Sequence, residues 1–259
     1  MEKQEFIERL RNAVSTFADG VQDDNGAWTV KGFIDTNRDI YTISTDTKVV
    51  SKIVELYIFP KICKFAHDNG LRLELTKEQN FYPDMTFIDR DGNLFAVDIK
   101  SSYRKNSKSI NGMTLGAFTG YFRERTSTKN VTHPYGNYKA HVVLGIIYSL
   151  ADGGDDEFKV YRLENLDDIK SVIKNFSFFV QEKWRIAIDR AGSGNTKNIG
   201  SVSDISALIG GKGPFAELGE EIFDDYWMHY LTKDMARKAE LSEPYYTNLT
   251  EYKAFKRLS

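Results

Sequence analysis

The chain has 259 residues, of which 41% are hydrophobic, and this is enough for one substantial core. No apolar run approaches the roughly 20 residues that a bilayer-spanning helix needs, and the charged start, MEKQEFIERLRNA, does not resemble a secretion signal. The single cysteine, Cys63, excludes an internal disulfide framework and suits a reducing, cytoplasmic compartment. Because Cys63 lies in a helical apolar pattern, we expect it to be a small core residue.

The net charge of -2 argues mildly against a nucleic-acid partner, but the charges are unevenly distributed. Basic residues cluster at 100–108, 123–129 and 253–257, while acidic residues gather at 152–157 and 217–225. A phosphate group would respond to such local basic surface rather than to the total. On charge alone, ordinary solvated faces are the simpler interpretation.

The N-terminal part predicts a helix followed by two short strands. A helix over residues 2–17 is indicated by apolar residues three and four positions apart, namely Phe6, Leu10, Val14 and Phe17. Residues 28–33 and 40–43 are predicted strands around a turn at 35–38.

A second helix is predicted over residues 48–69. Thr45 or Asp46 can cap its start, Pro60 should kink it, and Gly70 should end it. Its expected apolar stripe is Val49, Ile53, Leu56 and Tyr57.

The remaining segments alternate between strands and polar connections. In chain order we expect strands at 84–88 and 94–100, a helix-like segment at 115–125, a strand at 141–148, a surface loop at 151–157, a strand region at 176–188, a polar loop at 191–200 and a mostly helical, aromatic C-terminal part. The run HVVLGIIY at 141–148 is typical of a strand buried on both faces. The chain shows no repeat and no low-complexity linker, and it predicts a mixed α/β domain with a central sheet.

The segment with most chemical information contains Tyr82-Pro83-Asp84 and, after thirteen residues, Asp98-Ile99-Lys100. Side chains at i and i+2 of a strand share a face, so Asp98 and Lys100 point the same way. A charged pair at the end of an otherwise apolar strand needs a reason, because a buried unpaired charge is costly.

The position of Asp84 depends on the hairpin register. A three-residue loop over 90–92 would place Asp84 opposite Asp98 and Gly92 at the left-handed position that such loops favour. A two-residue loop of Asp91 and Gly92 would turn Asp84 to the opposite face. The first arrangement joins the charged groups, and it gives one shared apolar face: Met85, Phe87, Phe95, Val97 and Ile99.

Two adjacent carboxylates suit a hard divalent cation such as magnesium. The cation can polarise a phosphate, and Lys100 can hold the attacking water and stabilise developing negative charge. Glu55 could add a further acid, although a glutamate on an exposed helix face is usually only solvated. The alternative for the whole pattern is a surface cluster of salt bridges.

This pattern resembles the PD-(D/E)xK nuclease superfamily, and within it the EcoRV-like type II restriction endonucleases. The resemblance covers most of the chain from Ser44 onward, whereas residues 1–43 and 152–169 match poorly. Its segments are 44–55, 79–86, 96–103, 114–116, 129–130, 179–201, 225–227 and 251–252.

The resemblance implies an α/β fold with a central five-stranded mixed sheet flanked by helices. One domain would span residues 1–259, with residues 27–43 and part of 150–170 forming a small dimerisation subdomain. It also implies magnesium as cofactor, replaceable by manganese, and double-stranded DNA cut at the centre of GATATC to leave blunt ends. The enzyme would be a homodimer of the prokaryotic cytoplasm with a companion DNA methyltransferase.

Roles for individual residues follow from the same resemblance. The catalytic residues would be Asp84, Asp98, Lys100 and Glu55, with Asp84, Asp98 and Glu55 at the metal. Base edges would be read by Gly192, Ser193, Gly194, Asn195 and Thr196, with Gln79 and Asn80 near the minor groove. The DNA backbone would be contacted by Thr47, Lys48, Ser102, Lys129 and Lys197.

Departures from the family concern DNA contacts rather than catalysis. Lys197 adds a positive charge beside the recognition loop, and Gly120 stands where the family prototype has a serine. The Asn195 amide suits the N6/N7 edge of adenine, although GSGN by itself is more typical of a flexible turn.

Two other functions remain open from the sequence. One is a structure-directed or non-specific nuclease of the same superfamily, acting in DNA repair or recombination. The other is a DNA-binding protein without catalysis, whose signature would be loss of Asp98 or Lys100, and both are present. The four histidines are too scattered for a zinc set, and Ser193 lacks the G-x-S-x-G context of a hydrolase.

Overall fold

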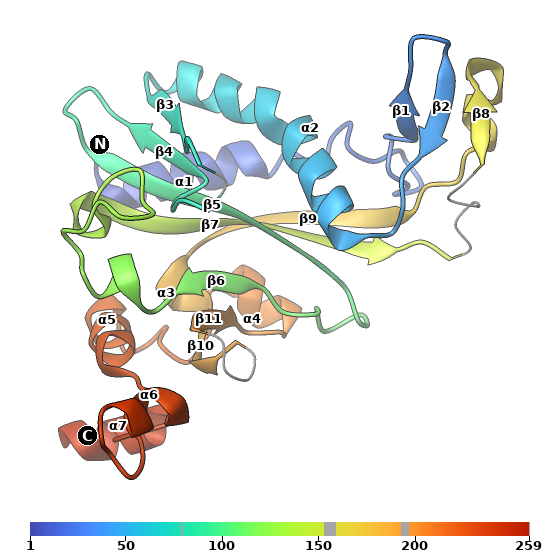
Figure 1. Ribbon diagram of the computed structural model, residues 1–259. Coiled ribbons are helices and arrows are strands. Elements are labelled where there is room, and N and C mark those ends of the chain that lie inside the picture. Colours follow the sequence, from blue (N-terminus) through green and yellow to red (C-terminus); the bar gives the residue numbers. More distant parts are fainter. Residues whose placement is uncertain (79, 153–158, 193–196, 259) are drawn as a thin grey trace.

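A mixed β-sheet of five strands runs through the middle of the computed structural model, which describes residues 1–78, 80–152, 159–192 and 197–258 (Figure 1). The strand order is β3-β4-β5-β7-β9, with β5 and β7 parallel and the other neighbours antiparallel. The strands are β3 (Arg72–Leu75), β4 (Met85–Ile88), β5 (Leu94–Tyr103), β7 (Tyr138–Leu150) and β9 (Ile173–Glu182). This confirms the expected α/β fold class.

Strand β7 lies at the centre of the packing. Its residues from Ala140 to Tyr148 are all buried, so the apolar run at 141–148 is the doubly covered strand that we expected.

The sheet separates two hydrophobic cores. Helices α1 (Lys3–Val14) and α2 (Thr47–Asp68) cover one face, where Phe6 stacks on Phe95 with ring centroids 4.3 Å apart. The other face packs against a second layer (Figure 1). That layer holds a three-stranded sheet in the order β10-β11-β6 and two short helices: β6 (Thr114–Ala117), α3 (Lys183–Ile186), β10 (Ala187–Ala191), β11 (Asn198–Ser201) and α4 (Ile205–Gly210).

A separate small sheet projects beyond one end of the main sheet (Figure 1). It has the order β1-β2-β8 and encloses a small core of Ile40, Tyr161 and Ile169. Its strands are β1 (Gly32–Ile34), β2 (Asp39–Thr42) and β8 (Val160–Arg162), followed by the 3-10 helix η3 (Leu163–Asp168). The predicted hairpin is therefore confirmed, but its first strand begins later than residue 28, because Trp28 is buried in the main core.

Helix α2 matches its predicted limits but not its predicted face. The Asp46 side chain accepts from Lys48 N at 2.8 Å, and the helix continues through Pro60 and ends before Gly70, whose φ is +63°. The expected stripe is wrong in part, since Val49 and Leu56 are exposed. The buried residues are Val50, Ile53, Val54, Ile58, Ile62, Phe65 and Ala66.

Three further predictions need correction. Cys63 is exposed rather than buried, because the core-facing side of α2 uses Ile62 and Phe65 instead. The helix-like segment at 115–125 is strand β6 and the 3-10 helix η1 (Gly120–Phe122), since β6 pairs with β11. The strand region at 176–188 ends at Glu182 and continues as α3 and β10. Of the predicted loop at 151–157, residues 153–157 lie outside the described part.

The C-terminal part is helical and aromatic, as expected. Its elements are α5 (Glu220–His229), α6 (Lys233–Lys238) and α7 (Leu249–Lys256), and the short 3-10 helix η2 (Tyr135–Asn137) precedes β7. Tyr226, Trp227 and Tyr252 are buried there. In the described part of the chain, no helix is both long and apolar enough to cross a membrane.

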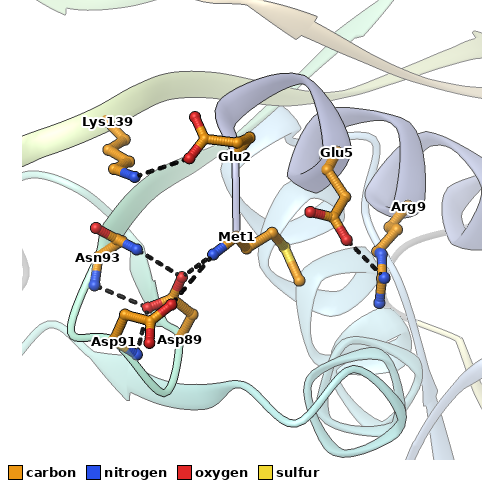
Figure 2. Close-up of polar contacts among 8 residues, drawn as sticks. All are labelled: Met1, Glu2, Glu5, Arg9, Asp89, Asp91, Asn93 and Lys139. Carbon is orange, nitrogen blue, oxygen red and sulfur yellow. Dashed lines mark hydrogen bonds and ion pairs between the residues drawn. The ribbon is translucent and has the colours of Figure 1, made fainter.

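The start of α1 lies against the loop between β4 and β5 (Figure 2). The amino group of Met1 contacts the Asp89 carboxylate, which also accepts from the backbone and side-chain nitrogens of Asn93 at 2.9 and 2.8 Å. Glu2 pairs with Lys139 at 3.6 Å. These contacts stabilise the hairpin that carries the candidate site.

Candidate active site

The hairpin of β4 and β5 has the register that the three-residue loop predicted. Met85 pairs with Val97 and Ile88 with Leu94, and Gly92 has a φ of +81° in the loop. Continued by one residue, this register places Asp84 opposite Asp98, and Asp84 N donates to Asp98 Oδ1 at 3.1 Å. The expected apolar residues of the hairpin all belong to the core beneath α1 and α2.

Three charged side chains meet on the other face of the hairpin. Lys100 Nζ lies 3.1 Å from Asp98 Oδ2 and 3.5 Å from Asp84 Oδ2. Asp84 Oδ2 also accepts from Ile99 N at 2.8 Å. Asp98 is buried, whereas Asp84 and Lys100 are only partly covered. The site is therefore a fixed, half-open arrangement of two carboxylates and one ammonium group.

The two carboxylates affect each other strongly. Burial, and then the negative charge of Asp98, raise the pKa of Asp84 to about 6, although Lys100 and the Ile99 N–H oppose this shift. Burial alone would lower the pKa of Lys100, but the charges of Asp98 and Asp84 outweigh it and raise that pKa. Lys100 is thus held as a cation, while Asp84 ionises reluctantly.

The donor set fits a hard divalent cation. A cation between Asp84 and Asp98 would remove the repulsion that raises the pKa of Asp84, and carboxylate oxygens are suitable ligands. No group of three His, Cys, Asp or Glu side chains close enough to hold a metal occurs among the described residues. The protein would then supply two carboxylate ligands and leave the other coordination positions of the cation for water and phosphate.

Glu55 lies near the site without joining it. Its charge further raises the pKa of Asp84, but its side chain is partly exposed and pairs with Lys52 at 2.8 Å. A hydrogen bond of 2.6 Å between Ser51 Oγ and Ser101 Oγ ties this part of α2 to strand β5.

The predicted base-reading loop connects β10 to β11. Its two described ends, Gly192 and Lys197, are exposed. Gly192 N donates to Asn198 O at 2.8 Å, and Phe118 N donates to Lys197 O at 2.9 Å, so both ends are anchored in the second layer. Ser193, Gly194, Asn195 and Thr196 lie outside the described residues.

The other predicted DNA contacts are scattered around the site. Asn80 is exposed just before Tyr82, and Gln79 lies outside the described residues. Thr47 and Lys48 are exposed in the first turn of α2, and Lys129 is exposed as well. Ser102 is only 5% exposed and shares its strand face with Asp98 and Lys100. Of the described candidates, only Asp84, Asp98 and Lys100 are in direct contact with one another.

One notable residue was missed from the sequence. Lys183, the first residue of α3, is almost completely buried among aromatic rings near the site. A signal was present, because this lysine lies in a segment rich in large apolar residues, between Phe178-Phe179-Val180 and Trp184.

Known proteins of one family resemble the chain over nearly its full length. The family model described as restriction endonuclease EcoRV matches residues 24–257. The type II restriction enzyme EcoRV of Escherichia coli is 36% identical over 242 residues, which cover 92% of this chain and 95% of that enzyme. The similarity therefore starts earlier than residue 44, where the sequence resemblance was expected to begin.

Among solved structures, the NlaIV restriction endonuclease aligns with 98% of this chain and 96% of its own, at 10% identity and a TM-score of 0.41. At that score it adds nothing to the assignment. The family match and the identity to EcoRV carry it instead, and this family implies a divalent metal ion and a DNA substrate. The chain therefore belongs to the EcoRV family of type II restriction endonucleases, which are hydrolytic, DNA-binding nucleases of restriction systems.

Proposed function

We propose that the enzyme cuts both strands of DNA at a short palindrome in a magnesium-dependent reaction. The palindrome is GATATC, cut at its centre to leave blunt ends. The observation that carries this proposal is the contact of Asp84, Asp98 and Lys100 in one hairpin register. Identity of 36% over nearly the whole of EcoRV supports the choice of DNA sequence.

The three side chains have separate tasks in this proposal. Asp84 and Asp98 would hold the magnesium ion, with Glu55 as a nearby further acid and manganese as a workable replacement. Magnesium supplies Lewis-acid stabilisation of the negative charge on the phosphate. Lys100 orients the attacking water and balances the charge that develops in the transition state.

DNA recognition would come from the second layer, which contains β6, β10 and β11. This layer covers the face of the main sheet to which Asp98 points. The loop from Gly192 through Ser193, Gly194, Asn195 and Thr196 would read bases, and Gln79 and Asn80 would approach the minor groove. Thr47, Lys48, Ser102, Lys129 and Lys197 would contact or approach the backbone. The exposure of Lys48, Lys129 and Lys197 supports a role in phosphate contacts.

The enzyme would act as a homodimer, because a two-fold protein matches a two-fold DNA site. The proposed interface is the subdomain of residues 27–43 and part of 150–170, with the start of α2. The small sheet exposes several large apolar side chains, which is typical of an interaction surface. They are Phe33 (52% exposed), Ile34 (58%), Tyr41 (46%), Val160 (49%) and Leu163 (49%).

A companion methyltransferase and a location in a prokaryotic cytoplasm belong to the same proposal. An enzyme that cuts a six-base-pair site would otherwise destroy the DNA of its host. GATATC fragments methylated by such a partner should resist cutting.

The test is to digest a DNA of known sequence with magnesium and to sequence the fragment ends. Blunt ends within GATATC support the proposal. A different fixed palindrome would reject only the recognition sequence. Cuts at branched or flapped DNA without a shared sequence would instead favour a structure-directed nuclease, and binding without cutting would favour a non-catalytic protein.

A further inference from the structure

Lys183 is a buried cation in an aromatic enclosure. The residue is 2% exposed, and its ammonium group has no hydrogen-bond partner among the described residues. Instead it lies 5.5 Å from the ring centre of Tyr82, 5.2 Å from that of Phe122 and 5.5 Å from that of Tyr135. These distances are within the range of cation–π attraction.

Burial of the Lys183 ammonium group destabilises the folded protein. A buried charge without hydrogen bonds is costly, and cation–π contacts recover only part of that cost. Burial lowers the pKa of Lys183 to about 8, even though the charge of Asp98 acts in the opposite direction. A buried residue that costs stability in this way is a candidate for a functional role.

The enclosure joins the second layer to the segment just before β4, which carries Asp84. Tyr82 lies two residues before Asp84, and its hydroxyl bonds to His141 Nδ1 at 2.7 Å. The Tyr82 ring also stacks on Tyr121 at 5.1 Å. The Lys183 ammonium contacts this fixed ring as well, 5.5 Å from its centre.

Lys183 also begins the segment of α3 and β10 that leads along the chain to the recognition loop. Helix α3 continues directly into β10, which ends beside Gly192 (Figure 1). Strand β6, which pairs with β11, approaches the ammonium so closely that a Cβ added to Gly116 would lie 3.5 Å from Nζ. The ammonium group is therefore where α3, β6 and the residues before β4 meet.

We propose that Lys183 is a positioning residue for DNA cleavage, whose caged ammonium fixes Tyr82, and through it Asp84, relative to the layer that carries the recognition loop. This rests on the proposed function above. Lys183 does not touch the reacting atoms in this scheme, so its loss should reduce the rate of cutting rather than the affinity for DNA. Misplacement of a reacting group by about 1 Å can cost about 100-fold in rate.

The test replaces the ammonium with a neutral group of similar length, in Lys183→Met and Lys183→Gln. The single-turnover cleavage rate at saturating enzyme should fall about 100-fold. The affinity for the same DNA, compared in a Lys100→Ala background that does not cut, should stay unchanged. The melting temperature of Lys183→Met should stay equal or rise, because an uncompensated buried charge has been removed.

Lys61→Met is the matched control. The Lys61 ammonium donates to the carbonyl oxygens of Thr16 and Phe17, both at 3.2 Å, and lies 5.8 Å from the Phe17 ring, away from the three charged side chains. Its loss should lower the melting temperature and leave the cleavage rate of the folded enzyme unchanged. Replacing Lys183 should slow cleavage without lowering the melting temperature, whereas replacing Lys61 should do the reverse. This contrast distinguishes a positioning role from a structural one.

Each contrary outcome is informative. If Lys183→Met and Lys183→Gln cut at the parental rate, the positioning role is wrong. If Lys183→Met melts well below the parent or does not fold, Lys183 is a structural residue and the inference is also wrong. A parent enzyme that cuts no DNA would reject the proposed function itself, which is a separate result from either.

Discussion

Asp84→Asn is predicted to stabilise the metal-free enzyme while it abolishes cleavage. The folded structure raises the pKa of Asp84 from its ordinary value of 3.8 to about 6. For a carboxyl group with a raised pKa, the folded state favours the protonated form. Ionised Asp84 therefore destabilises the fold at neutral pH, and this penalty disappears as the pH falls from about 6 to below 3.8.

The size of the effect follows from the same shift. A change of about 2 pKa units corresponds to about 3 kcal/mol at most, at about 1.4 kcal/mol per unit. The Asp84 side chain is 39% exposed, so solvent screening reduces this to about 1 kcal/mol. For a chain of this size, that corresponds to a rise of about 2–4 °C in melting temperature. The amide oxygen of the replacement can still accept from Ile99 N, so the hairpin keeps this contact.

The assay is thermal unfolding of the parent and of Asp84→Asn at pH 7.5 and pH 4.5, each with a chelator and with excess magnesium. With the chelator, the variant should melt higher at pH 7.5, and this difference should shrink at pH 4.5, between the two pKa values of Asp84. With magnesium the order should reverse, because a ligand that binds the folded state at 100 times its Kd adds about 2.7 kcal/mol to the parent. If the variant melts lower than the parent at pH 7.5 without metal, the electrostatic account of the site is wrong.

Four other results are expected. Asp98→Ala should remove cleavage but leave circular dichroism unchanged, and cutting near the parental rate would refute its role. Asn195→Ala should flatten the cleavage profile on a randomised six-base-pair library, because a good base contact contributes about 1–3 kcal/mol of discrimination. Lys197→Ala should weaken binding to all sequences alike and reduce the salt dependence by about one ion per contact, as measured by titrations at several salt concentrations. Phe33→Asp combined with Ile34→Asp should yield monomers in sedimentation at micromolar protein, and an intact dimer would place the interface elsewhere.

The hairpin of the candidate active site could be predicted from the sequence because its information is local. Gly92 suits a tight loop and the two-residue period limits the hairpin to two registers, of which only the three-residue loop joins Asp84 to Asp98 and Lys100. The buried strand at 141–148 could also be predicted, because a continuous apolar run is visible in the sequence without knowledge of the neighbouring strands.

The errors arose where contacts between distant segments decide the structure. The segment at 115–125 has a helical pattern, but pairing with β11 makes its first part a strand. Helix α2 has apolar residues on more than one side, so the sequence could not show that Val50 and Val54 face the core rather than Val49 and Cys63. Lys183 was missed because its burial depends on rings that come from three other parts of the chain.

The most direct test of the central claim compares the parent with Lys100→Ala on a randomised DNA library in magnesium, at equal folded concentration. The pairing of β4 with β5 runs from Met85–Val97 to Ile88–Leu94 and does not involve Lys100, so loss of this side chain should leave the hairpin intact. The same loss removes the ammonium group that contacts both carboxylates and balances charge during hydrolysis. We predict blunt cuts at one palindrome by the parent, and no detectable cuts by the variant, which should still bind the same sequence. Cuts by Lys100→Ala at the same sites and at a similar rate would contradict the assignment of Asp84, Asp98 and Lys100 as the active site.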